Sequence, residues 1–125
     1  MKHIISTHDA PKAIGPYSQA VKVGQFVFSA GQIAIKPSTG AVIEGGIGEQ
    51  TEQVLENIKA VIQASGANLS SVVKTNVYLV NADDFAAMNE VYARYFQTEP
   101  PARTTIFVKA LPKGVLVEID AIAQL

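Results

Sequence analysis

Two segments of this chain carry apolar residues at helical spacing, and they limit its fold more than any other feature. The first stripe consists of Val54, Leu55, Ile58, Val61 and Ile62, and Gly66 is suited to end that helix. The second stripe, after capping residues at 81–84, consists of Phe85, Met88, Tyr92, Tyr95 and Phe96. Each stripe has to be buried, and most of the remaining segments have the character of strands. We therefore expect a two-layer α+β domain with both helices on one face of a sheet.

The sheet is predicted from segments that are bounded by turn residues and rich in β-branched side chains. Residues 18–23 and 26–31 flank Gly24-Gln25, a two-residue loop that is typical of a hairpin. A short strand is expected at 41–43 and a longer one at 72–80. Residues 103–109 and 115–123 form a last pair, joined by the loop Leu-Pro-Lys-Gly at 111–114. The order of the strands in the sheet does not follow from this pattern.

The composition fits one domain that spans residues 1–125. Hydrophobic residues make up 48% of the chain and charged residues 17%, which allows a core but leaves a modest polar surface and favours an oligomer. The net charge is -1 and the basic residues form no stripe, which disfavours binding to nucleic acid phosphates. The first residues lack the apolar run of a signal peptide, and no stretch is long enough to span a membrane. We therefore expect a cytoplasmic protein.

The sequence offers neither a metal site nor a conventional nucleophile. It has no cysteine, which excludes disulfides, thiolate nucleophiles and Cys-ligated metals. His3 and His8 precede almost every other polar residue, so they fit surface positions better than metal ligands or a Ser-His-Asp triad. We interpret Asp83 and Asp84 as capping and first-turn charges of the second helix, and no metal is expected.

The last two strands suggest where chemistry takes place. If 111–114 closes a symmetric hairpin, alternation places a nearly apolar set beneath the helices, namely Thr104, Ile106, Val108, Val115, Val117, Ile119, Ala121 and Ala123. The opposite face then carries Arg103, Thr105, Phe107, Leu116, Glu118, Asp120 and Ile122. A face that is half apolar and half charged indicates contact with another chain, with its charges near the junction. Taken alone, the hairpin is explained more simply by a cross-strand ion pair between Arg103 and a carboxylate.

Several segments, in order along nearly the whole chain, resemble the signature segments of the RidA family, also called YjgF or L-PSP. They are residues 13–20 (AIGPYSQA), 28–33 (FSAGQI), 73–75 (VKT), 88–92 (MNEVY), 101–104 (PART) and 111–123 (LPKGVLVEIDAIA). The resemblance implies a chorismate-mutase-like fold, with two helices on one face of a mixed sheet. It also implies a homotrimer whose active sites lie in clefts between subunits. The implied activity is 2-iminobutanoate/2-iminopropanoate deaminase, which hydrolyses 2-imino acids and enamines to 2-keto acids and ammonia and needs no cofactor.

The resemblance also assigns roles to residues. Arg103 matches the arginine that binds the substrate carboxylate, a task that suits a planar guanidinium with two parallel donors. Glu118 matches the glutamate that orients or activates water, and Tyr17 matches a tyrosine of the pocket wall. The other matching pocket positions are Ser29, Gly31, Asn89 and Thr105.

The residue at position 105 departs from the family pattern. Many bacterial relatives have cysteine where this chain has Thr105, so a mechanism that uses that thiol is excluded here.

Two alternatives to the deaminase remain open from the sequence. The first is a regulator that binds 2-keto acids or other small carboxylates without turnover, which would need the same Arg103. The second is a ribonuclease or translation inhibitor, which the near-neutral charge and the absence of a histidine near the expected pocket disfavour.

Overall fold

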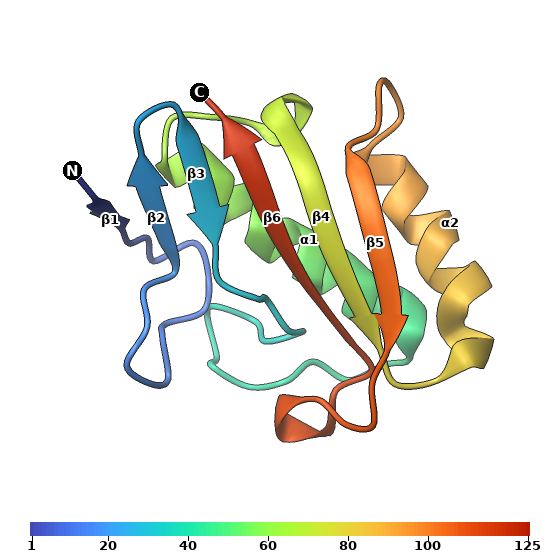
Figure 1. Ribbon diagram of the computed structural model, residues 1–125. Helices are drawn as coiled ribbons and strands as arrows, with labels where there is room; N and C mark the ends of the chain where they lie inside the picture. Colours follow the sequence, from blue (N-terminus) through green and yellow to red (C-terminus); the bar gives the residue numbers. More distant parts are fainter.

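The computed structural model describes residues 1–125 and contains six strands and two α-helices. The elements, in chain order, are β1 (His3–Ile5), β2 (Ala20–Val23), β3 (Phe26–Ser29), α1 (Ile47–Ala64), β4 (Val72–Leu79), α2 (Phe85–Tyr95), β5 (Ala102–Phe107) and β6 (Val117–Gln124). The strands form one sheet in the order β1-β2-β3-β6-β4-β5 (Figure 1). Only β4 and β5 are parallel neighbours, so the sheet is mixed, as expected. The short strand predicted at 41–43 is reduced to a single bridge between Ile35 and Val42.

The predicted hairpin between the last two strands is wrong. β4 lies between β5 and β6, pairing in parallel with β5 and antiparallel with β6. The reason is the helix α2, which carries the chain across one face of the sheet and returns it as a strand parallel to β4. The segment after β5 then passes the end of β4. There the Val108 N–H donates to the Leu79 carbonyl, and the Val80 N–H donates to the Leu116 carbonyl.

This topology exchanges the two faces that were predicted for β5. Arg103 stands opposite Thr75, a fully buried residue of β4, so Arg103 lies on the helix-covered face. Thr105 lies on that face as well, whereas Ile106 lies on the face that no helix covers, which we call the open face. The prediction for β6 is confirmed, because Val117, Ile119, Ala121 and Ala123 are buried beneath α1.

The core lies between the sheet and the two helices. The predicted stripe of α1 is buried throughout, and Gly66 follows that helix with a φ of +95°, which favours glycine. In α2 the predicted face is only partly buried: Met88 and Tyr92 are buried, but Phe85 is 38% exposed. The expected side-chain caps of α2 are absent, since neither Asn81 nor Asp84 makes a capping hydrogen bond. Neither helix is long and apolar enough to cross a membrane.

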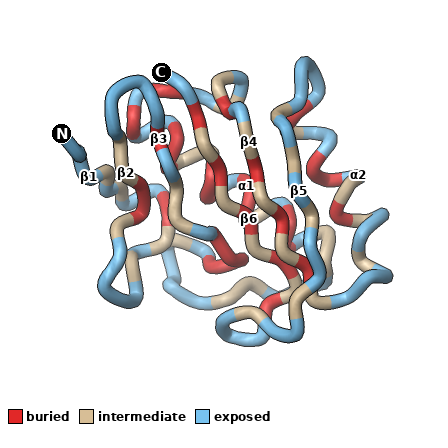
Figure 2. Tube along the Cα trace, in the orientation of Figure 1, coloured by how far each residue is buried: buried red, intermediate tan, exposed pale blue.

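The open face is only partly apolar and only partly buried. Along β4 and β6, buried residues alternate with half-buried ones, whereas much of β5 and the β2–β3 turn is exposed (Figure 2). Phe28, opposite Ile122, and Ile106 expose apolar surface here. The expectation that Phe107 belongs to this face is wrong, because its ring lies 6.4 Å from that of Phe85 on the helix side. The mixed apolar and charged character that was expected of one sheet face nevertheless holds for the open face.

Candidate active site

A cavity of about 300 Å³ opens beside the N-terminal end of β6, and it brings together three of the residues that the sequence pointed to. Tyr17, Gly31 and Glu118 all line it. The wall is completed by residues from the N-terminal segment, from the stretch after β3 and from the loop before β6: Pro11, Lys12, Ile14, Gln19, Ala30, Gln32, Ile33, Ile35 and Pro112. The site is therefore built where the two stretches that flank the β2–β3 hairpin meet the loop before β6 and the start of that strand.

Glu118 is the one carboxylate in the cavity, and no side chain of the same chain is paired with it. It forms no ion pair, since the only ion pair of the chain joins Arg94 to Glu52. Burial raises the pKa of the Glu118 carboxyl, and the negative charge of Asp120 raises it further. A carboxylate with a raised pKa and free lone pairs can accept a proton from a water molecule beside it.

Gly31 makes room for this carboxylate. A Cβ atom built at Gly31 would lie 2.9 Å from Cδ of Glu118 and would overlap one of its oxygens. The backbone φ of Gly31 is not in the left-handed region, so the glycine is required for space and not for conformation. Gly31 and Glu118 thus form a close-packed pair across the cavity wall.

Tyr17 is held in the wall of the cavity by a small loop. Its hydroxyl oxygen accepts a hydrogen bond of 3.2 Å from the Ile14 N–H, and the Tyr17 N–H donates to the Gly15 carbonyl at 2.8 Å. The side chain is 49% exposed, and its hydroxyl proton remains available to a bound molecule.

The buried amide of Gln19 fixes the N-terminal segment on which Tyr17 depends. Its Oε1 accepts from the Thr7 N–H at 2.7 Å, and its Nε2 donates to the carbonyls of Thr7, Ala10 and Pro11 at 3.0, 3.3 and 2.8 Å. Gln19 lies within the signature segment 13–20, but nothing in the local pattern predicts that its side chain is buried.

A second buried amide supports the part of the wall that contains Ile33 and Ile35. Asn57 of α1 donates to the carbonyls of Ile33 and Ile35 at 3.1 and 2.9 Å, and it accepts from Gln53 at 2.9 Å. The loop that contains Pro112 is tied to the same helix, because the Leu116 N–H donates to Oε1 of Gln50. Gln50 and Asn57 are both buried on α1, but they lie among polar positions of the sequence, so their burial was not predicted.

Three further polar residues that the sequence pointed to, Asn89, Arg103 and Thr105, lie on the helix-covered face near the edge strand β5. The guanidinium carbon of Arg103 lies 4.8 Å from the ring centre of Tyr92 and 5.7 Å from that of Phe85. Asn89 is half-buried on the same side of α2, since positions 85, 89 and 92 share one helix face. The Thr105 hydroxyl is buried there without a hydrogen-bond partner. The cross-strand ion pair considered for Arg103 is absent.

Ser29 belongs to neither group. Its hydroxyl oxygen accepts a hydrogen bond of 2.9 Å from the Ala121 N–H, which ties β3 to β6 at the point where their ladder ends. It does not line the cavity.

The two groups cannot meet within one chain. Arg103 is in register with Thr75 and Glu118 with Tyr78, on strands that flank β4. Two strand spacings and three residues of rise separate their Cα atoms by roughly 14 Å, and the side chains leave opposite faces of the sheet. If one ligand contacts both residues, a second copy of the chain has to supply one of them.

The fold and these two groups define a small α+β protein with an unpaired carboxylate in a cavity and an arginine presented at a sheet edge. The family model described as Endoribonuclease L-PSP matches residues 7–125. A RutC family protein of Pyrococcus horikoshii is 58% identical over 98% of this chain and 98% of its own length. The mouse protein named 2-iminobutanoate/2-iminopropanoate deaminase is 46% identical over 98% of this chain and 91% of its own.

The solved structures agree with this likeness. The crystal structure of E. coli TdcF with bound serine superposes with a TM-score of 0.95 at 42% identity, covering 98% of each chain. The chain therefore belongs to the L-PSP family, whose members include the Rid and RutC proteins. This confirms the resemblance and the fold that the sequence motifs indicated.

Proposed function

We propose that this protein hydrolyses 2-imino acids to 2-keto acids and ammonia. The observation that carries the proposal is the unpaired Glu118 carboxylate in a cavity that also contains the Tyr17 hydroxyl. Hydrolysis of a C=N bond needs a positioned water and a group that takes its proton, and these two side chains suit that task. The name of the mouse relative supports the same reaction.

In the proposed reaction, water attacks the carbon of the protonated imine, C=NH2+, while Glu118 accepts one of the water protons. The C=N π electrons move to nitrogen, which becomes an NH2 group on a tetrahedral carbon that also carries the new hydroxyl. The proton held by Glu118 then passes to that nitrogen, which returns Glu118 to its ionised state. The C–N bond breaks, the hydroxyl oxygen forms the carbonyl, and its proton leaves with the nitrogen as ammonium, so that the 2-keto acid remains. Tyr17 can donate a hydrogen bond to the water or hold the imine nitrogen.

Arg103 would bind the substrate carboxylate from a neighbouring subunit. Its aromatic contacts leave the edge of the guanidinium without a partner in the chain, so two parallel N–H donors remain available. TdcF, whose structure contains serine, offers a precedent for a ligand with a carboxylate. Asn89 and Thr105 lie beside Arg103 and would complete this part of the pocket.

The assembly proposed is a homotrimer, with one such site at each junction. The apolar side chains exposed on the open face, Phe28 and Ile106 among them, favour burial against another copy. Sedimentation should give three times the 13.3 kDa mass of the chain. A stable monomer at micromolar concentration would contradict both the assembly and the shared site.

A coupled assay tests the activity. Threonine or serine dehydratase is supplied with its amino acid, and the release of 2-keto acid and ammonia from the imine is followed with and without this protein. We expect faster release in its presence, with no added metal or cofactor. If pyruvate binds but release is not accelerated, the protein is a carboxylate-binding regulator instead.

The family model carries a ribonuclease description, which is a second candidate. No histidine lines the cavity, and the net charge of -1 supplies no attraction for phosphates. We therefore favour imine hydrolysis for this site.

A further inference from the structure

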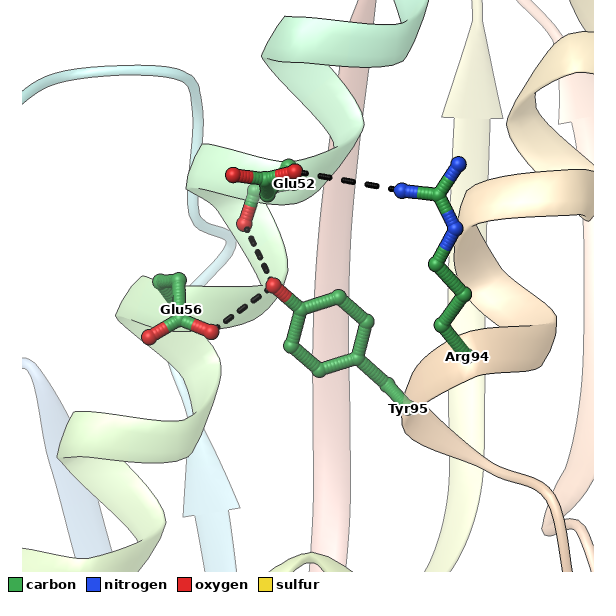
Figure 3. Close-up of polar contacts among 4 residues, drawn as sticks. All are labelled: Glu52, Glu56, Arg94 and Tyr95. Atoms are coloured by element: carbon green, nitrogen blue, oxygen red, sulfur yellow. Dashed lines mark hydrogen bonds and ion pairs between the residues drawn. The ribbon is translucent and has the colours of Figure 1, made fainter.

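Arg103 is oriented in a way that no other arginine of the chain shares. Arg94, on α2, forms an ion pair with Glu52 of α1, with 4.0 Å between Nη1 and Oε2 (Figure 3). Beside it, the Tyr95 hydroxyl donates to Oε2 of Glu56 at 2.7 Å. Arg103 has no such partner and instead lies over two aromatic rings of the same helix. An ion pair would occupy the donors and charge that a substrate carboxylate needs, whereas rings contact only the face of the guanidinium.

The nearer ring, that of Tyr92, is fixed at both ends. Its hydroxyl shares a hydrogen bond of 2.7 Å with the buried Thr75 hydroxyl, and Thr75 is the β4 residue in register with Arg103. On the other side the Phe96 ring lies 4.7 Å away, tilted by 41°. Burial raises the pKa of Tyr92, although its hydrogen bond with Thr75 and the charge of Arg103 partly offset this. The ring therefore stays neutral and in place.

The second ring belongs to Phe85, two helical turns before Tyr92. It is 38% exposed, although a large apolar side chain gains from burial, and its own neighbour is Phe107 of β5. Arg103 is part of β5 and both rings are part of α2, the helix that connects β4 to β5. The guanidinium therefore bridges the edge strand and this helix.

We propose that Tyr92 and Phe85 are positioning residues for Arg103, which hold the face of its guanidinium so that both edge donors are free for a substrate carboxylate. The inference rests on the proposed function, because it gives Arg103 the carboxylate. The rings act in the ground state and in the transition state alike, so losing one should raise KM and leave kcat nearly unchanged.

The test compares Phe85→Leu with Tyr95→Leu, a matched change on the same helix at a ring that does not contact Arg103. Phe85→Leu should raise KM for the imine and Kd for pyruvate by about 3- to 30-fold, the range expected for losing a cation–π contact. Tyr92→Phe keeps the ring and should stay within about twofold of wild type. Tyr95→Leu should change neither constant. In an Arg103→Ala background, Phe85→Leu should weaken pyruvate binding no further.

The possible outcomes distinguish a failure of the positioning role from a failure of the proposed deaminase function. Equal KM in Phe85→Leu and wild type, or equal losses in Phe85→Leu and Tyr95→Leu, would overturn the positioning role while the deaminase stands. If wild type releases no keto acid from imine but binds pyruvate, the deaminase fails, and the Kd values still decide the inference. If pyruvate does not bind either, the NMR shift of the Arg103 Nε–H group decides it. A shift unchanged by Phe85→Leu would mean that the ring does not hold the guanidinium.

Discussion

Glu118 and Asp120 lie two residues apart on the open face of β6, yet only the Asp120 carboxylate is held by hydrogen bonds. Asn76 donates to it at 2.8 Å and Tyr78 at 3.0 Å, whereas the Glu118 carboxylate projects into the cavity beside Gly31 without a partner. Two carboxylates on one strand therefore have different environments, and these suit different roles. Asp120 organises the sheet surface, and Glu118 is free to act on a bound molecule.

This difference predicts unequal effects of two matched substitutions. Glu118→Gln keeps the shape but cannot take a proton, so turnover should fall by about 10²–10⁴-fold, the usual contribution of a general base. Asp120→Asn should reduce turnover much less, because it removes a charge that does not touch the water. The coupled assay measures both, with sedimentation to check that each variant still assembles. Equal losses in the two variants would indicate a structural charge network.

The raised pKa of Glu118 predicts the acid side of the pH profile. A base works only when ionised, so kcat/KM should fall as the pH drops through a pKa that lies above the usual 4.5. Burial is the first cause of the rise and the Asp120 charge the second, so Asp120→Asn should move this limb to lower pH. The profile is measured with the dehydratase in excess at every pH. A limb that stays in place in Asp120→Asn would argue against Glu118 as the base.

Arg103→Ala should nearly abolish turnover and weaken pyruvate binding. A hydrogen bond to a charged group contributes about 1.5–3 kcal/mol, and Arg103 is proposed to make two. Arg103→Lys should recover only part of the activity, since an ammonium group lacks the planar pair of donors. Stability should fall by only about 1 kcal/mol, because no ion pair is lost.

Melting temperature and turnover are measured on the same preparations of these Arg103 variants. Normal turnover by a destabilised Arg103→Ala would make Arg103 structural and remove the basis of the proposed mechanism.

Gly31→Ala tests whether Glu118 needs its position. The added methyl group would overlap the Glu118 carboxylate and displace it, and a shift of about 1 Å can cost on the order of 10²-fold in rate. Gly48→Ala is the control, because a Cβ at Gly48, inside α1, meets nothing within 4 Å. We expect a folded Gly31→Ala with low kcat and an unaffected Gly48→Ala. Full activity in Gly31→Ala would show that the carboxylate can move without loss.

The local pattern of the sequence predicted the elements well where a single segment decides the structure. The stripe of α1 is buried as its spacing required, and the β2–β3 hairpin turns at Gly24, whose φ is +56°. The assembly of the last three strands was not predictable in this way. The sequence pattern of β5, the following loop and β6 is the same whether these two strands pair with each other or have β4 between them. Only the path of α2 decides between the two arrangements.

The same distinction between local pattern and strand assembly applies to the candidate site. The family motifs pointed to Tyr17, Gly31 and Glu118, which the structure brings to one cavity. They could not tell that Arg103 leaves the other face of the sheet, because that depends on the register of β5 against β4. Buried Gln19 and Asn57 were missed because an amide at a polar position looks in sequence like a surface residue.

The separation of Arg103 and Glu118 across one sheet has a consequence for mixtures of variants. Arg103→Ala chains keep an intact Glu118, and Glu118→Gln chains keep an intact Arg103, so each inactive variant carries what the other lacks. Refolded together at equal amounts, they should form hybrids in which about a quarter of the junctions regain both groups. Activity that returns when two inactive variants are mixed, and that is lost again on dilution below the dissociation constant of the assembly, is the behaviour of an enzyme whose active site no single chain contains.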